Sequence, residues 1–236
     1  MNAAPADAAP ATPGTKPVLA ILGGTGKEGS GLAVRWANAG YPVIIGSRDG
    51  ARAIATAAEL AGLIGTHAKI SGASNLDAAT RAQVIVLAVP YNAQLSTVEE
   101  IRAALDGKML IDVTVPLVPP KVDRVQLPEG GSAVVRLQQM LGAQVQVVSA
   151  FQNVSAHHLK VLDHPIECDV LICSDSAEAR ERVVALAKAG GMRGINAGAL
   201  ANSAAAEALT SVLIAINKRY KIPSAGIRIT GIPDEG

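Results

Sequence analysis

The chain has 236 residues, a formal net charge of +1, and only one Phe, one Trp and three Tyr. This length is enough for one α/β domain with a smaller appended unit, whose core needs neither metals nor disulfides. Acidic and basic residues are mixed along the sequence without a basic block, which argues against a nucleic-acid-binding surface.

The N-terminal segment, residues 1–16, is rich in Ala and Pro and has neither a basic start nor an apolar stretch. It lacks the features of a secretory signal, so we expect a flexible tail. No uninterrupted apolar run reaches the ~18 residues that span a bilayer. The sequence therefore predicts a cytoplasmic protein with no membrane partner.

Apolar runs and helical stretches alternate from residue 17 to residue 114. The apolar runs predict strands at 17–22, 41–46, 68–70, 83–90 and 108–114. Between them we expect helices from the glycine-rich turn to Ala39, at 51–62, at 77–81 and at about 93–105. Apolar strands that alternate with helices are typical of a parallel sheet with right-handed crossovers.

The pattern changes at the proline-rich segment 115–131, which we expect to form a loop over a bound cofactor. The elements predicted after it are helices at 132–141, 176–189 and 199–220, and strands at 145–151, 168–175 and 191–196. We predict a Rossmann-type doubly wound parallel sheet, residues 17–149, with a smaller C-terminal α/β unit, residues 150–236. The last helix has more small and apolar residues than one buried face needs, which predicts a homodimer joined through this unit.

A G-x-G-x-x-G motif follows the first predicted strand and opens the first helix. Gly24 permits the tight turn, Gly26 lets a pyrophosphate approach the backbone, and Gly29 lets the helix pack closely on the strand. The helix N-terminus adds amide donors and the positive end of a dipole. In this context the motif predicts a dinucleotide-binding site.

The end of the second predicted strand indicates which dinucleotide is bound. NAD-binding domains usually place an acid there, which accepts hydrogen bonds from the ribose hydroxyls. This chain has Ser47 and Arg48 instead, with Arg52 one helical turn further on. A guanidinium pairs with a 2′-phosphate that a carboxylate would repel, and we expect the nearest acid, Asp49, to begin the next helix. The sequence therefore favours NADP(H) over NAD(H).

With these residues in place, the chain resembles the NADPH-dependent reductases of the deazaflavin coenzyme F420 (F420H2:NADP oxidoreductases). The resemblance rests on ILGGTGKEGSGLA, GSRDGARA, LAVPY, VPLVPP, VVSAFQNVSA and the C-terminal LANS, EALTSVLIAIN and AGIRIT segments. It covers nearly the whole chain beyond the tail. It implies an enzyme that transfers a hydride between NADP(H) and coenzyme F420.

The resemblance also implies the cofactor-binding residues. The pyrophosphate would contact Thr25, Gly26, Lys27 and Glu28, and the 2′-phosphate would contact Ser47, Arg48 and Arg52. Val89 and Pro90 would line the nicotinamide side, Ala156 would touch NADP, and Ala225 and Gly226 would line the deazaflavin pocket. Two positions on the expected deazaflavin side depart from the family: Gln152 replaces a histidine, and Ala204 replaces an arginine that is common there.

Two cofactors that exchange a hydride directly carry the chemistry themselves, while the protein holds and orients them. We therefore expect no catalytic triad and no metal site, and none of the four histidines has metal-ligand spacing. Because His157 and His158 are adjacent, we do not expect both to face one site. Cys168 and Cys173 are expected to be buried thiols.

Two other functions stay open at this point. One is an NADP-dependent reductase of another small carbonyl or imine substrate on the same scaffold. Such enzymes usually have a longer, all-helical C-terminal domain with a catalytic lysine, whereas this chain has strands there. The other is a non-enzymatic module that senses NADP(H), because cofactor binding alone does not establish turnover.

Overall fold

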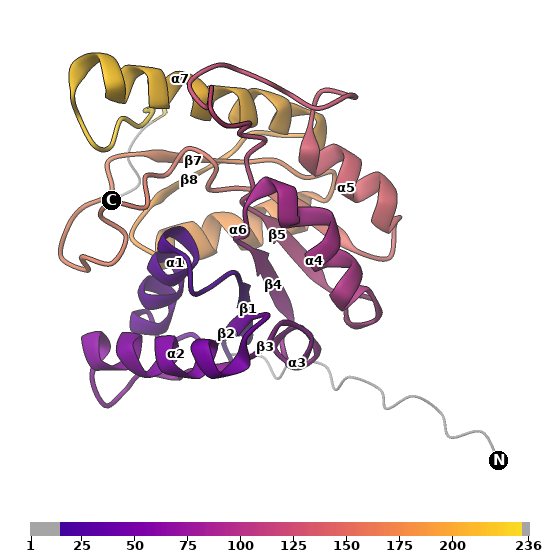
Figure 1. Cartoon of the computed structure of the whole chain (residues 1–236), viewed down its shortest axis with the longest axis vertical. Coiled ribbons are helices and arrows are strands. Elements are labelled where there is room, and N and C mark those ends of the chain that lie inside the picture. The colour runs from indigo at the N-terminus through magenta and orange to yellow at the C-terminus, as the bar shows by residue number, and fades with distance from the viewer. Residues whose placement is uncertain (1–14, 233–236) are drawn as a thin grey trace.

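The computed structural model describes residues 15–232, so most of the tail predicted at 1–16 lies outside the described residues. The strands are β1 (Leu19–Leu22), β2 (Val43–Ser47), β3 (Ile70–Ser74), β4 (Val84–Leu87), β5 (Met109–Asp112), β6 (Gln146–Ser149), β7 (Asp169–Ile172) and β8 (Arg193–Asn196). The helices are α1 (Lys27–Asn38), α2 (Gly50–Ile64), α3 (Asn75–Arg81), α4 (Gln94–Ile101), α5 (Ala133–Leu141), α6 (Ala177–Ala189) and α7 (Ser203–Tyr220). Figure 1 shows how these elements are arranged.

Six strands form one parallel sheet in the order β3-β2-β1-β4-β5-β6. This is the strand order of a Rossmann fold, in which β1 and β4 lie side by side at the point where the winding reverses. The predicted fold class is therefore confirmed. Ligands in such folds bind at the carboxyl ends of the strands, beside this switch point.

Alternate residues of each strand pack on opposite faces of the sheet. Leu19 and Ile21 of β1 belong to the hydrophobic cluster under α1, α2 and α6, whereas Ala20 and Leu22 belong to the cluster under α3, α4 and α5. Both sets are fully buried. A strand covered on both sides must be apolar throughout, which is why these strands are recognisable as continuous apolar runs.

The third strand was predicted in the wrong place. The sequence pattern placed it at 68–70, but β3 spans Ile70–Ser74, and α3 begins at Asn75 rather than at 77. The sequence of β3, ISGAS, lacks an apolar run because an edge strand is only partly buried. Gly72 lies so close to α2 that a Cβ there would be 2.3 Å from the carbonyl group of Ala53.

A small two-stranded parallel sheet, β7-β8, lies beside the edge strand β6. Ser149 and Cys173 connect the two sheets, because each backbone N–H donates to the other residue's carbonyl oxygen, at 2.9 and 3.0 Å. Trp36 of α1 donates its indole N–H to the carbonyl of Leu186 in α6 at 2.8 Å. Residues from both predicted domains thus share one hydrophobic cluster, and the division at residue 149 stays a prediction.

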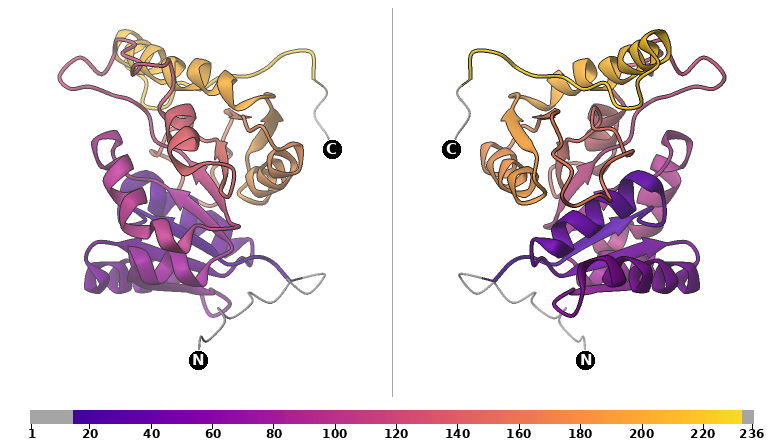
Figure 2. Two further views of the ribbon diagram at one scale, coloured as in Figure 1. Left: turned by 90° about the vertical axis from the view of Figure 1, so that its right-hand side faces the viewer. Right: turned by 90° about the vertical axis from the view of Figure 1, so that its left-hand side faces the viewer.

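The last helix is preceded by a 3₁₀ turn at Leu200–Asn202 and lies across the end of the molecule farthest from α2 (Figure 2). Its buried face carries Glu207, which is 1% exposed. The Glu207 carboxylate accepts hydrogen bonds from Ser132 Oγ at 2.5 Å and from the backbone N–H of Ala133 at 2.8 Å. These groups lie at the N-terminus of α5, so the contact fixes α7 against α5.

Candidate active site

A cavity of about 190 Å³ lies at the carboxyl ends of β1, β2 and β4, and we call it the sheet-edge cavity. Seven residues predicted to bind the cofactor line it together: Thr25, Gly26, Ser47, Arg48, Arg52, Val89 and Pro90. They come from three loops that are distant in sequence. The parallel sheet brings these loops together because all three follow the same ends of neighbouring strands.

The turn between β1 and α1 leaves no room for a side chain where it packs against the helix, but it is open on the side that faces solvent. A Cβ on Gly29 would be 2.7 Å from the carbonyl oxygen of Gly23, because this residue packs the helix against the turn. A Cβ on Gly26 would meet only that same oxygen, at 3.2 Å, and the residue is exposed. The open side of Gly26 is the space that a pyrophosphate needs when it approaches the backbone.

Helix α1 begins directly at this turn. Gly26 is its N-cap and makes no side-chain hydrogen bond, and the helix amides begin to pair only with Ser30 N, which donates to the Gly26 carbonyl at 3.0 Å. The N–H groups of the first turn therefore remain available to an anion, and the helix dipole favours one. Lys27 and Glu28 belong to this turn, although neither lines the sheet-edge cavity.

Arg48 and Arg52 are exposed in the sheet-edge cavity, and neither makes an ion pair or a hydrogen bond through its side chain within residues 15–232. Asp49 begins α2, as predicted: its carboxylate accepts from the backbone N–H of Arg52 at 3.1 Å. Ser47 Oγ accepts from the N–H of Asp49 at 3.2 Å. Asp49, the acid that follows Arg48 in the chain, is thus used as a helix cap, which leaves two guanidinium groups for a phosphate.

The sequence patterns missed two polar residues of this cavity. Asn75 opens α3, is 2% exposed, and donates from Nδ2 to Glu100 at 3.2 Å, while its Oδ1 has no hydrogen-bond partner. Thr97 reaches the same cavity from α4. Asn75 follows directly after β3, and polar residues in that position are a signal for a binding site. The misplaced third strand hid this signal.

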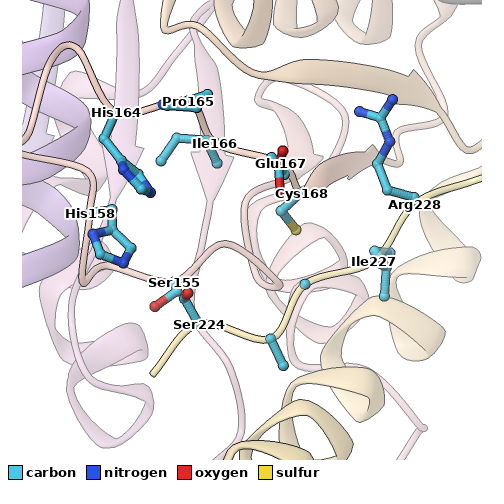
Figure 3. A pocket seen from close by; sticks show the side chains of 12 residues that line it. Ser155, His158, His164, Pro165, Ile166, Glu167, Cys168, Ser224, Ile227 and Arg228 are labelled. Carbon is cyan, nitrogen blue, oxygen red and sulfur yellow. The ribbon is translucent and has the colours of Figure 1, made fainter. Parts of the chain in front are cut away.

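A second cavity, of about 430 Å³, lies between the segments 155–168 and 224–228, and we call it the loop cavity. Figure 3 shows His158 and His164 on one side, Ser155 and Ser224 below them, and Arg228 on the opposite side. Ala225 and Gly226, two predicted site residues, also line it. A third one, Ala156, follows Ser155 directly and packs against the hydrophobic core.

Arg35 of α1 holds the wall of the loop cavity in place. Its guanidinium is buried and donates to the carbonyl oxygens of Leu159, Val161 and His164, at 2.8, 2.9 and 3.0 Å. It also donates to Gly190 at the end of α6, at 3.2 Å. One cation therefore ties the loop to two helices through backbone atoms.

The chain matches, over residues 18–116, the family model described as NADP oxidoreductase coenzyme F420-dependent. It is 42% identical over 224 residues to the F420-dependent NADP reductase of Methanothermobacter thermautotrophicus, a match that covers 92% of this chain and 96% of the relative. The reductase of the same name from Methanocaldococcus jannaschii is 40% identical, covering 91% and 98%. The chain belongs to this family.

Membership confirms the resemblance inferred from the sequence: the chain is an oxidoreductase of a family that depends on NADP and coenzyme F420. Its fold is similar to that of a solved candidate F420-dependent NADP reductase from Arthrobacter sp. FB24, with a TM-score of 0.74, 24% identity, and coverage of 91% of this chain and 99% of that one. An imine reductase from Myxococcus stipitatus has a TM-score of 0.59 and 21% identity, and the match covers 88% of this chain and 62% of the other.

The two residues that depart from the family pattern, Gln152 and Ala204, lie in different parts of the structure. Gln152, in the place of a family histidine, is 4% exposed and donates from Nε2 to the carbonyl oxygen of Asp112 at 2.8 Å. Its Oε1 has no partner. Ala204 lies in the first turn of α7. His158 lines the loop cavity, its ring stacked on His164 at 4.0 Å, and His157 packs edge-on against it at 4.5 Å.

Both cysteines are buried and free, as expected. Burial raises the pKa of the Cys168 thiol, and it raises that of Cys173 to about 11, so neither is poised as a thiolate. Among residues 15–232, no three His, Cys, Asp or Glu residues come together in a group that could hold a metal ion. In the same residues, one helical segment, Leu200–Tyr220, has the length and hydropathy of a membrane span, and 33% of its most apolar 18-residue window is buried inside the protein.

Proposed function

We propose that NADP(H) binds in the sheet-edge cavity and exchanges a hydride with coenzyme F420 bound in the loop cavity. The observation that carries this proposal is the meeting of Gly26, Arg48, Arg52 and Val89 in one cavity at the switch point of the sheet. The glycine turn and the α1 amides would hold the pyrophosphate, and the two arginines would hold the 2′-phosphate. The nicotinamide would then lie over β4, against Val89 and Pro90.

The loop cavity is the proposed seat of the deazaflavin. It contains Ala225 and Gly226, which match the family segment that lines this pocket. Ser155 lines the loop cavity, and the next residue, Ala156, is the proposed NADP contact. If the deazaflavin contacts Ser155 and NADP(H) contacts Ala156, the deazaflavin and nicotinamide rings would lie next to each other. The pairing of two neighbouring cofactors needs no catalytic side chain, because the nicotinamide supplies the hydride when it is bound.

Turnover tests this proposal directly. Purified protein is mixed with NADPH and the oxidised deazaflavin coenzyme, and the loss of deazaflavin absorbance is followed. We expect absorbance loss that depends on both protein and NADPH. Intact NADPH binding without turnover would contradict the proposed second substrate, and would favour another carbonyl or imine substrate or a sensing role.

We further propose that the protein is a cytoplasmic homodimer joined through α7. The outward side of this helix has an apolar stripe at helical spacing, in which Ala205 and Val212 are exposed and Ala208 and Ala215 are partly exposed. Small residues allow two helices to approach closely, and an isologous contact would pair the helix with its own copy. An exposed stripe of this kind is typical of a protein interface.

Light scattering across a dilution series measures the mass. We expect a dimer for the unmodified chain and a monomer for Ala208→Arg, with Ala189→Arg at the end of α6 as a control outside the stripe. A monomeric mass at micromolar concentration with full activity would contradict the dimer. If Ala208→Arg removed deazaflavin binding and kept NADPH binding, the interface would be tied to the loop cavity.

A further inference from the structure

The buried amide of Asn75 lies at the end of β2, where the 2′-phosphate of the coenzyme is proposed to bind. Asn75 is 2% exposed and lines the sheet-edge cavity together with Ser47 and Arg48. Its Oδ1 atom would be 3.2 Å from a Cβ on Gly46, the residue that precedes Ser47 in β2. The side chain therefore belongs to the adenosine half of the proposed coenzyme site.

One hydrogen bond fixes the direction in which this amide points. Asn75 Nδ2 donates to the carboxylate of Glu100 in α4 at 3.2 Å. An ionised carboxylate accepts hydrogen bonds and donates none, so the amino group of the amide must face Glu100 and the amide oxygen must point away from it. The bond to Glu100 therefore presents an acceptor, Oδ1, at the end of β2.

No group in the described part of the chain donates to this acceptor, although Oδ1 is buried. An asparagine at the start of a helix often serves as its cap. Here Ser74 caps α3 instead, because its Oγ accepts from the N–H of Asp77 at 3.2 Å. A buried acceptor without a donor is costly, so a ligand that fills the cavity binds best when it supplies one.

The chemistry of the coenzyme narrows the choice of donor. In the adenosine half of NADP(H) the neutral donors are the ribose 3′-hydroxyl and the amino group of adenine, since the 2′-oxygen carries the phosphate. The 3′-hydroxyl is on the carbon next to that phosphate, whereas the amino group is at the far edge of the base. We propose that Asn75 Oδ1 accepts a hydrogen bond from the ribose 3′-hydroxyl. This role rests on the proposed placement of the 2′-phosphate at Ser47 and Arg48.

The proposal gives Asn75 a role different from that of Arg48. The 2′-phosphate distinguishes NADPH from NADH, but both coenzymes have the 3′-hydroxyl. Replacing Asn75 should therefore weaken the binding of both by the same factor, whereas replacing Arg48 should weaken mainly NADPH. One hydrogen bond between neutral groups corresponds to a roughly 2- to 10-fold change in dissociation constant.

An NADPH analogue that lacks the 3′-hydroxyl, 3′-deoxy-NADPH, tests the contact. Fluorescence titration measures the dissociation constants of NADPH and of the analogue. We expect the unmodified protein to bind the analogue roughly 2- to 10-fold more weakly than NADPH. Asn75→Ala should bind the two equally, because either change removes the same hydrogen bond. The matched control, Asn38→Ala, changes an exposed asparagine at the end of α1 and should keep the difference.

The outcomes separate this inference from the proposed function. If the unmodified protein bound NADPH and its 3′-deoxy analogue equally, or if Asn75→Ala kept the preference for NADPH, the contact would be refuted. A coenzyme with hypoxanthine in place of adenine tests the other donor. If Asn75→Ala removed the preference for adenine over hypoxanthine instead, Oδ1 would contact the base and the proposal would be wrong. If the unmodified protein bound none of these coenzymes, the placement of NADP(H) itself would have failed.

The variant should fold, because Glu100 is exposed and Asn75→Ala leaves no buried charge without a partner. Circular dichroism checks this. Should Asn75→Ala be unfolded, Asn75→Leu takes its place, since leucine has a similar branched shape and no acceptor. The same loss of discrimination between NADPH and 3′-deoxy-NADPH is expected of it, and retained discrimination would refute the contact.

Discussion

Replacing Arg48 should weaken NADPH binding and leave NADH binding nearly unchanged. The guanidinium is exposed in the sheet-edge cavity and makes no side-chain contact within the described residues, so Arg48→Ala removes no internal interaction. One charge-assisted hydrogen bond to a phosphate contributes about 1.5–3 kcal/mol. Its loss corresponds to a roughly 10- to 100-fold larger dissociation constant for NADPH.

Arg48→Glu should have a larger effect. A carboxylate about 4 Å from the 2′-phosphate adds a repulsion of roughly 1–4 kcal/mol, depending on how well water screens it. Fluorescence titration with NADPH and NADH measures both affinities for each variant, and Arg81→Ala, in an exposed ion pair of α3, is the matched control. Equal losses for the two coenzymes would show that Arg48 does not contact the 2′-phosphate.

Three further predictions concern the turn, the loop and the interior. Gly26→Val should keep its circular dichroism spectrum and lose NADPH binding, whereas Gly29→Val should lower the melting temperature, since its Cβ would clash at 2.7 Å with the turn. Arg35→Met should lower the free energy of unfolding by about 2–4 kcal/mol in urea titrations, because buried carbonyls lose a charged donor; an unchanged midpoint would contradict this. Burial raises the pKa of Glu207, so its contribution to stability is greatest below its unfolded value of 4.5 and is lost as pH rises through the folded one. The free energy of unfolding should therefore fall less with rising pH in Glu207→Gln than in the unmodified protein. Thermal melts from pH 5 to 8 would show this difference.

The fold could be predicted where burial on both faces makes a strand apolar throughout. β1, β4 and β5 satisfy this condition, and their apolar runs were found within a few residues. β3 does not, because it is an edge strand of small and polar residues whose place is set by contact with α2. Its boundary depends on tertiary packing, for which the sequence around Ile70 has no periodic signal.

The candidate site could be predicted where its residues are adjacent in the chain. Gly26 and Arg48 belong to local motifs whose spacing follows from a strand, a turn and a helix. Asn75 and Thr97 reach the same cavity from α3 and α4, and neither belongs to a motif. The contacts of Arg35 are still less visible, because the partners are backbone carbonyl oxygens that every residue has.

Because Arg35 binds backbone carbonyl oxygens, it does not restrict which side chains the loop around His158 and His164 carries. It nevertheless fixes the path of the loop. Substitutions at His158 and His164, which line the loop cavity, would alter what it presents to a ligand and leave the contacts of Arg35 in place. If the loop cavity binds the second substrate, as proposed above, directed evolution of the substrate preference would begin with a library at His158 and His164, with Arg35 held constant.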